Sequence, residues 1–194
     1  MRIAFDLDEV VSETVKEWAE FHNRKFGTHW KLEHLHDYDL WKVWGGSQDE
    51  YLQEWVEFWK SAHFDSVAPV QGAVEGLKEL RKKHELHIIT SRSTPVREKT
   101  MEWIGKHFPG TFAGVHLVGK DNYAGYVNQK WEICHQIKAD WMVEDRFYHA
   151  RTCAEHGIPV LLLSRPWNAK KELPKNVYRV DSWNEIVQKL DGAT

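Results

Sequence analysis

The chain has 194 residues, of which 42% are hydrophobic and 28% are charged. This mixture predicts a globular protein with one main core and excludes an extended disordered chain. The formal net charge of −3 gives no basic surface for duplex nucleic acid or for an anionic membrane. The longest purely apolar run, residues 160–163, is far too short to span a bilayer.

Cysteine content and the N-terminus indicate a cytoplasmic protein. The two cysteines, Cys134 and Cys153, are too few for a disulfide framework, and no CxxC pair offers a zinc site. Carboxylates occur from Asp6 onward, which excludes the apolar run of a secretory signal. We therefore expect a reduced protein of the cytoplasm.

The first third of the chain changes from one strand to helices. Residues 2–7 are an apolar run of strand length, and residues 12–26 carry apolar side chains at helical spacing up to a stop at Gly27. Residues 28–46 are aromatic, polar and irregular. A capping box from Ser47 to Glu50 then opens another helix. Six of the 11 tryptophans lie between residues 18 and 59, and we predict that residues 12–66 are all-helical.

From residue 67 onward, strands alternate with helices. We expect strands at 86–90, 115–118, 141–145, 158–164 and 178–180, and helices at 72–84, 94–108, 128–138, 147–156 and 182–190. This alternation predicts an α/β fold with a doubly wound, mostly parallel sheet. Residues 1–11 and 67–194 would form this core, and residues 12–66 would be a helical cap inserted after the first strand.

Polar side chains follow three of the expected strands, and a lysine precedes the last of them. They are Asp6 and Asp8, then Thr90, Ser91 and Arg92, then Lys130, and finally Glu144 and Asp145. The carboxyl ends of parallel strands meet in one crevice, so these groups should lie together. Clustered carboxylates repel one another unless they are protonated or bound to a hard cation such as Mg²⁺. Hydroxyls and a lysine suit a phosphate, and the set predicts phosphoryl transfer.

At these positions the chain resembles the haloacid-dehalogenase superfamily of phosphotransferases. IAFDLDEVV (3–11) resembles the first motif of the superfamily, IITSR (88–92) the second, Lys130 the third and VEDR (143–146) the fourth. Two positions complicate the match. Glu9 stands where the family usually has glycine, and Lys120 is an alternative to Lys130 ten residues upstream.

The resemblance implies a role for each residue. Asp6 would be the nucleophile, and Asp8 the general acid and then the general base. Asp6, Asp8 and Asp145 would bind Mg²⁺, with Asp8 lending its backbone carbonyl and Glu144 assisting. Thr90 and Ser91 would hold the transferred phosphate, and Lys130 would neutralise it. The second aspartate, Asp8, indicates hydrolysis of phosphate esters, because members of the superfamily that do not hydrolyse them commonly replace it.

Within the superfamily, the chain is similar to the 5'(3')-deoxyribonucleotidase family and its bacterial relatives. The similarity rests on the place and size of the helical insertion, on the spacing from Lys130 to Asp145, and on residues 157–168. In that family a small cap holds a nucleobase with aromatic rings. Trp41 and Trp44, beside two glycines, are candidates for this contact here, or else for packing inside the cap. For Trp18, Trp55 and Trp59 we expect packing.

These expectations combine into a Mg²⁺-dependent phosphomonoesterase that works through an aspartyl-phosphate on a nucleoside or deoxynucleoside monophosphate. One alternative is a phosphatase for a small sugar or metabolite phosphate. Another is a phosphate-binding or regulatory module without turnover, which only Glu9 favours. Arg92, Arg146 and Arg165 would either steer an anionic substrate or serve as ordinary ion-pair partners.

Overall fold

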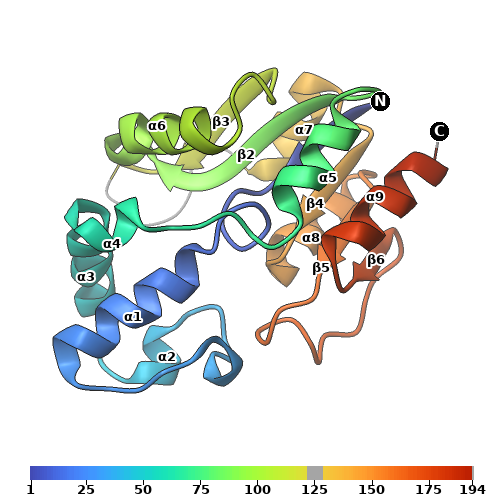
Figure 1. Cartoon of the computed structure of the whole chain (residues 1–194). Helices are drawn as coiled ribbons and strands as arrows, with labels where there is room; N and C mark the ends of the chain where they lie inside the picture. The colour runs from blue at the N-terminus through green and yellow to red at the C-terminus, as the bar shows by residue number, and fades with distance from the viewer. Residues whose placement is uncertain (122–128, 194) are drawn as a thin grey trace.

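The computed structural model describes residues 1–121 and 129–193. Its strands form a six-stranded parallel sheet in the order β3-β2-β1-β4-β5-β6 (Figure 1). The strands are β1 (Arg2–Phe5), β2 (Glu85–Ser93), β3 (Gly114–Gly119), β4 (Trp141–Glu144), β5 (Val160–Leu163) and β6 (Val177–Val180). The strand order reverses direction between β1 and β4, and the predicted doubly wound α/β fold is confirmed.

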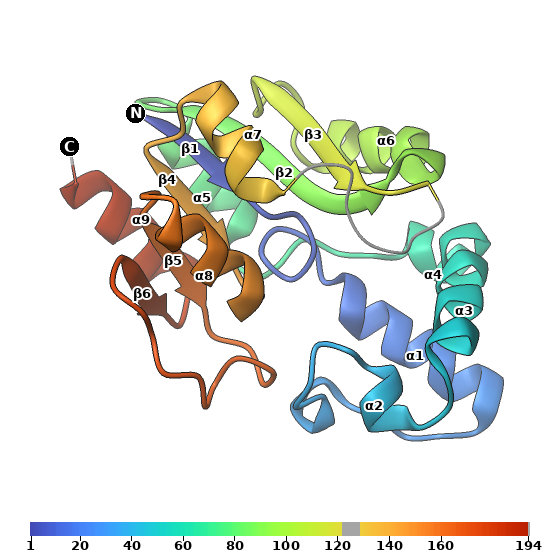
Figure 2. The ribbon, with the colours of Figure 1, turned by 180° about the vertical axis from the view of Figure 1, so that it is seen from behind.

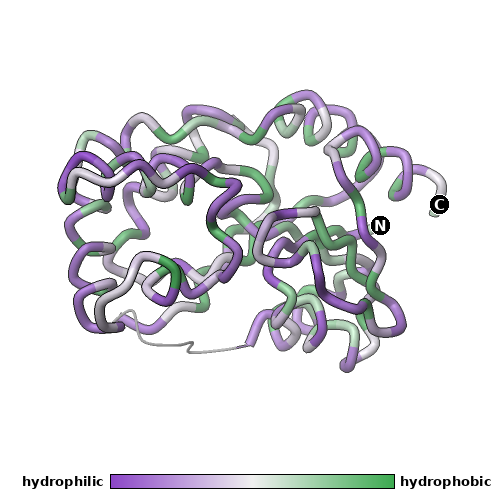
Figure 3. The backbone as a smooth tube through the Cα atoms, turned by 90° about the horizontal axis from the view of Figure 1, so that it is seen from below, coloured by the Kyte–Doolittle hydropathy of each residue, from purple (hydrophilic) through white to green (hydrophobic). Residues whose placement is uncertain are grey.

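Helices cover both faces of the sheet (Figures 1 and 2). On one face, α5 (Ala73–Leu80), α6 (Arg97–His107) and α9 (Trp183–Gly192) pack in one hydrophobic cluster with β1 and β2. On the other face, α7 (Lys130–Ile137) and α8 (Phe147–Glu155) pack against β4 and β5. Both faces of the sheet are therefore buried, which explains the short, strongly apolar strands. In Figure 3 hydrophobic residues alternate with hydrophilic ones along the surrounding helices.

Residues 14–65 hold the other helices of the described chain, and we call this part the helical unit. It comprises α1 (Thr14–Phe26), the short 3₁₀ helix η1 (Leu32–His34), α2 (Trp41–Trp44), α3 (Gln48–Lys60) and α4 (Ala62–Asp65). Aromatic side chains form its interior: the Trp18 ring lies 3.9 Å from that of Trp55 and 5.2 Å from that of Trp44. The division of the chain into core and cap remains a prediction, as does the function of this unit.

Two connecting segments join the helical unit to the sheet, and they run side by side. The amide of Glu13 donates to the carbonyl of Ala68 (2.9 Å), and that of Val70 to the carbonyl of Val11 (2.8 Å). A buried tryptophan fixes each segment, because Trp183 Nε1 donates to the Val10 carbonyl (2.8 Å) and Trp103 Nε1 to that of Val67 (2.7 Å).

Several element boundaries differ from the predicted ones. The region at 28–46, expected to be irregular, contains η1 and α2. The helix expected at 94–108 begins with a 3₁₀ turn, η2 (Thr94–Val96), and continues as α6 from Arg97. The helix expected from residue 128 begins at Lys130, and its first expected residue lies outside the described ranges. The box from Ser47 to Glu50 is formed as predicted.

Within the described residues, none of the helices combines the length and the apolar character that crossing a bilayer requires. Cys134 and Cys153 are buried and free. Location in the cytoplasm stays a prediction.

Candidate active site

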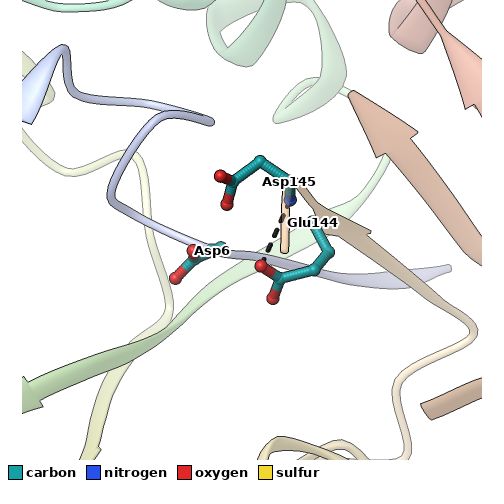
Figure 4. A group of neighbouring side chains, drawn as sticks. All are labelled: Asp6, Glu144 and Asp145. Atoms are coloured by element: carbon teal, nitrogen blue, oxygen red, sulfur yellow. Dashed lines mark hydrogen bonds between the residues drawn. The ribbon is translucent and has the colours of Figure 1, made fainter. Parts of the chain in front are cut away.

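The carboxyl ends of β1 and β4 bring three buried carboxylates together (Figure 4). Asp6 follows β1, where its amide continues the sheet by donating to the Val143 carbonyl (2.9 Å). Glu144 ends β4 and Asp145 follows it. One oxygen from each of Asp6, Glu144 and Asp145 can be chosen such that all three atoms lie within 4.8 Å of one another. This arrangement is the one that adjacent parallel strands predict for residues at their carboxyl ends.

Lys130 lies between two of these carboxylates. Its Nζ is 2.7 Å from Asp6 Oδ1 and 2.8 Å from Glu144 Oε2, and its side chain is 1% exposed. Lys130 is the first residue of α7, so the N-terminus of this helix places the ammonium group at the strand ends. The alternative, Lys120, is exposed. The structure therefore places Lys130 within the carboxylate cluster.

Burial and mutual repulsion keep protons on part of this cluster. Burial raises the pKa of Asp6 to about 8, with repulsion from Glu144 adding to the shift and Lys130 opposing it. The pKa of Asp145 is also well above its usual value, because of burial and the charges of Glu144 and Asp6. Although burial alone would lower it, Asp6 and Glu144 raise the pKa of Lys130 above its usual value. The cluster has one ammonium group for three carboxylates, so these protons balance its charge, and a bound cation could take their place.

Asp145 also has an oxygen that fits a cation. Its Oδ1 is buried and has no hydrogen-bond partner among the described residues. Its other oxygen, Oδ2, accepts a hydrogen bond from Trp167 Nε1 (2.9 Å). Glu144 differs, because its Oε1 accepts the amides of Asp145 (3.1 Å) and Arg146 (3.0 Å) while its Oε2 faces Lys130. Asp6 and Asp145 are therefore better placed than Glu144 to hold a hard cation.

Asp8 is paired with Arg92. Arg92 Nη2 lies 2.7 Å from Asp8 Oδ1, and Nε lies 3.2 Å from both carboxylate oxygens. Although burial opposes it, Arg92 lowers the pKa of Asp8. The guanidinium also lies over the rings of Trp59 (4.8 Å) and Phe64 (5.3 Å) in the helical unit. Of the two roles the sequence left open for Arg92, ion pairing is the one present in the structure.

The expected phosphate-binding hydroxyls lie beside this pair. Thr90 is fully buried, and its Oγ1 is 3.4 Å from Asp8 Oδ2. Ser91 Oγ is 3.4 Å from Nε2 of His149, a buried histidine of α8. No local sequence pattern singles out His149, because its neighbour Ser91 is 58 residues away in the chain.

Glu9 adopts the left-handed conformation that the usual glycine would favour, with φ at 62°. Its Oε1 accepts the amide of Val15 in the first turn of α1 (2.6 Å), and its carbonyl accepts Nη2 (2.6 Å) and Nε (3.0 Å) of Arg165. Burial raises the pKa of Glu9 to about 7, with Arg165 opposing. The Glu9 side chain thus anchors the first turn of α1, and Arg165 binds the backbone carbonyl of Glu9.

We expect Glu9→Ala to lower the free energy of unfolding by about 1–3 kcal/mol, because it leaves the buried Val15 amide without its acceptor. Glu9→Gly loses the same bond but relieves the left-handed backbone, so it should be more stable than Glu9→Ala by about 1 kcal/mol. Urea unfolding of both variants measures the difference. Equal stability of the two would show that the backbone at residue 9 is unstrained.

A cavity of about 540 Å³ joins the strand ends to the helical unit. Among the strand-end residues, Asp8, Ser91 and Arg92 line it. Its aromatic lining consists of Trp18, Tyr38, Tyr51, Trp55, Trp59 and Trp167. The carboxylates of Asp6 and Asp145 are not in the lining, but Trp167 connects it to Asp145 through its indole N–H. A second cavity, of about 460 Å³ beside Glu9 and Arg165, contains none of the predicted site residues.

Trp41 and Trp44, for which the sequence left open contact with a substrate or packing inside the cap, do not line the larger cavity. Trp44 packs inside the helical unit, where its ring stacks on His22 at 4.0 Å. Trp41 is half-buried, with Lys42 Nζ 5.5 Å from its ring centre. The structure instead lines the cavity with Trp55 and Trp59, for which we expected packing alone. Helical spacing identifies which residues face inward but not which of them border a cavity.

The chain has the haloacid-dehalogenase fold, with aspartates after β1 and β4 and a buried lysine at the strand ends. The sequence model of the family described as 5' nucleotidase, deoxy (pyrimidine), cytosolic type C protein matches residues 1–191. The chain belongs to this family, and it is a phosphoric monoester hydrolase.

Three known proteins illustrate the similarity. A protein of Halalkalibacterium halodurans named "Putative nucleotidase BH1399" is 30% identical over 192 residues, covering 98% of this chain and 92% of its own. The 5'(3')-deoxyribonucleotidase of Bacillus subtilis is 25% identical and covers 97% of each chain. A haloacid-dehalogenase family hydrolase from Deinococcus radiodurans, solved with bound phosphate and sodium, has a TM-score of 0.66 at 17% identity, covering 99% of this chain and 95% of its own.

Proposed function

We propose that the enzyme is a Mg²⁺-dependent 5'-nucleotidase that hydrolyses nucleoside or deoxynucleoside monophosphates through an aspartyl-phosphate on Asp6. The observation that carries the proposal is the 540 Å³ cavity, which is lined both by aromatic rings and by the strand-end residues Asp8, Ser91 and Arg92. This volume lies within the range of small-molecule sites. Aromatic rings suit a nucleobase, and the hydroxyl and guanidinium groups suit a phosphate.

In this proposal Asp6 attacks phosphorus with a carboxylate oxygen, and the bond to the leaving oxygen breaks. Asp8 gives its proton to that oxygen, which leaves as the nucleoside hydroxyl. Asp8 then takes a proton from water, which attacks the aspartyl-phosphate and releases phosphate and free Asp6. Thr90, Ser91 and Lys130 bind the phosphate oxygens. Arg92 must loosen from Asp8 before Asp8 can hold a proton, and an incoming phosphate dianion would compete for the same guanidinium.

Asp6, Asp145 and the backbone carbonyl of Asp8 would hold Mg²⁺, with Glu144 assisting through the amides and the lysine it binds. The ion supplies positive charge that keeps Asp6 ionised and offsets the charge of the phosphate.

We expect the affinity for Mg²⁺ to rise with pH between 6 and 8. Asp6, with a pKa near 8 in the metal-free protein, must lose its proton to bind the ion, so affinity gains up to about tenfold per pH unit for each proton released. The stability of the metal-free protein should change with pH in the opposite direction. Because the pKa of Asp6 is raised on folding, Asp6 contributes to folding stability below its ordinary pKa of 3.8, and this contribution is lost as the pH rises through about 8.

The Mg²⁺-dependent increase in melting temperature at pH 6, 7 and 8 measures this trend. A Mg²⁺ affinity that does not change over this range would contradict the prediction that Asp6 must lose a proton to bind the ion.

For base recognition we expect Tyr51→Ala to lower kcat/KM for a deoxynucleoside monophosphate by roughly 5- to 150-fold, the loss of one stacked base. Activity on deoxyribose 5-phosphate, the same ester without a base, should stay nearly unchanged. Tyr51 suits this test because it lines the cavity from α3, and Trp41→Ala, outside the lining, is the matched control. Equal losses on both substrates would refute stacking. A wild-type preference for the base-free ester would favour the sugar-phosphate alternative.

A further inference from the structure

The segment that follows β5 holds Asp145 at two points. Trp167 Nε1 donates to Asp145 Oδ2 at 2.9 Å. Asn168 Nδ2 donates to the Asp145 backbone carbonyl (2.7 Å) and to that of Leu163 at the end of β5 (2.8 Å). Trp167 is 6% exposed and Asn168 fully buried. Because the amide of Asp145 is bound to Glu144 as well, its Oδ1 is the atom left without a partner among the described residues.

Trp167 also contacts the helical unit. The Tyr38 ring meets the Trp167 ring edge-on, with centroids 6.1 Å apart. Arg146, the residue after Asp145, lies 4.1 Å above the ring of Tyr38 and 3.5 Å from Asp39 Oδ1. Residues 38 and 39 of the helical unit therefore contact both neighbours of Asp145: Trp167, its hydrogen-bond donor, and Arg146, the next residue in the chain.

We infer that Trp167 is a positioning residue for Asp145 and that Tyr38 makes this positioning depend on the helical unit. The inference rests on the proposed function, because it concerns the same cation. An indole N–H cannot bind a cation, but it occupies Oδ2 and leaves Oδ1 as the carboxylate oxygen without a hydrogen-bond partner among the described residues. Asp145 would then offer Mg²⁺ one oxygen, oriented by the hydrogen bond to the other.

The test compares two Trp→Phe substitutions. Trp167→Phe keeps a ring against Tyr38 but removes the hydrogen bond to Asp145. Trp103→Phe is the matched control, because Trp103 is equally buried (5% exposed) and its Nε1 donates to the Val67 carbonyl, away from the carboxylates. Both variants should lose stability. The Mg²⁺ concentration that half-saturates the increase in melting temperature, measured without substrate, should rise about tenfold in Trp167→Phe alone.

A Mg²⁺ affinity of Trp167→Phe within twofold of wild type would overturn the inference, as would an equal weakening in Trp103→Phe. If Trp167→Phe does not fold, the ¹⁵N-labelled wild-type protein gives the answer. Its Trp167 indole N–H resonance should move during a Mg²⁺ titration while that of Trp103 stays in place, and a stationary Trp167 resonance in a protein that binds Mg²⁺ would refute the positioning role.

A third variant, Tyr38→Ala, tests the contribution of Tyr38. Tyr38→Ala leaves the indole hydrogen bond in place but removes the edge contact, and we expect a smaller loss of Mg²⁺ affinity than in Trp167→Phe. An unchanged affinity would refute the link to the helical unit and leave the role of Trp167 intact. These measurements use no substrate. Absence of nucleotide hydrolysis in a wild type that binds Mg²⁺ would therefore count against the proposed function alone.

Discussion

Asp6→Asn should release phosphate on the order of 10⁴-fold more slowly than wild type, or slower, as expected when the nucleophile of a covalent mechanism is removed. The amide has the shape of the carboxylic acid but cannot attack phosphorus. The fold should survive, because Asp6 is already protonated over much of the neutral range in the metal-free protein and Lys130 keeps Glu144 as a partner.

Phosphate release and thermal melting should be measured on the same preparation. Asp49→Asn makes the same chemical change at an exposed position of α3 and should alter neither quantity. Activity of Asp6→Asn within tenfold of wild type would show that another group attacks phosphorus.

Of the variants considered, Lys130→Met should show the largest decrease in the free energy of unfolding. It leaves the buried carboxylate of Glu144 without its ion-pair partner and removes the ammonium group beside Asp6, and breaking a buried ion pair in this way costs about 3–5 kcal/mol. The free energy of unfolding from urea titration measures the loss. Lys120→Met, at the exposed alternative position, should change stability by no more than about 0.5 kcal/mol. Similar losses in both variants would contradict the central place given to Lys130.

The sequence predicted the strand-end cluster well, for a physical reason. In a parallel sheet the carboxyl ends of neighbouring strands lie at one edge, so residues distant in sequence can be placed together once the strands are recognised. Asp6, Glu144 and Asp145 meet in this way, as expected. Their catalytic and metal-binding roles remain predictions, because proximity shows what the groups can do and not what they do.

The cavity lining could not be predicted in the same manner. Trp44 lies on a four-residue helix, α2, whose short length gives no periodicity to read, and it turns inward onto His22. Trp167 and Asn168 lie in a loop, and their partner Asp145 is more than 20 residues away. No local pattern signals a hydrogen bond across such a distance, although the resemblance had drawn attention to residues 157–168.

Glu9 and Arg92 show a third situation, in which the sequence raised the question and the structure supplied the contact. Glu9 forms the same left-handed turn that glycine would form, and its side chain binds the first turn of α1. The replacement of glycine by Glu9 therefore gives no support to a module without turnover. Arg92 is bound to Asp8 and covered by Trp59 and Phe64, which connects the general-acid candidate to the helical unit.

Release of inorganic phosphate across a panel of monophosphates, with Mg²⁺ present, tests the central claim most directly. The panel should contain the common nucleoside and deoxynucleoside 5'-monophosphates, their 3'-isomers, and ribose 5-phosphate and deoxyribose 5-phosphate as matched esters without a base. We expect at least one nucleotide to be hydrolysed with a higher kcat/KM than its base-free counterpart, and EDTA to abolish the activity. Preference for the base-free ester in every such pair, or hydrolysis that survives EDTA, would contradict a Mg²⁺-dependent nucleotidase.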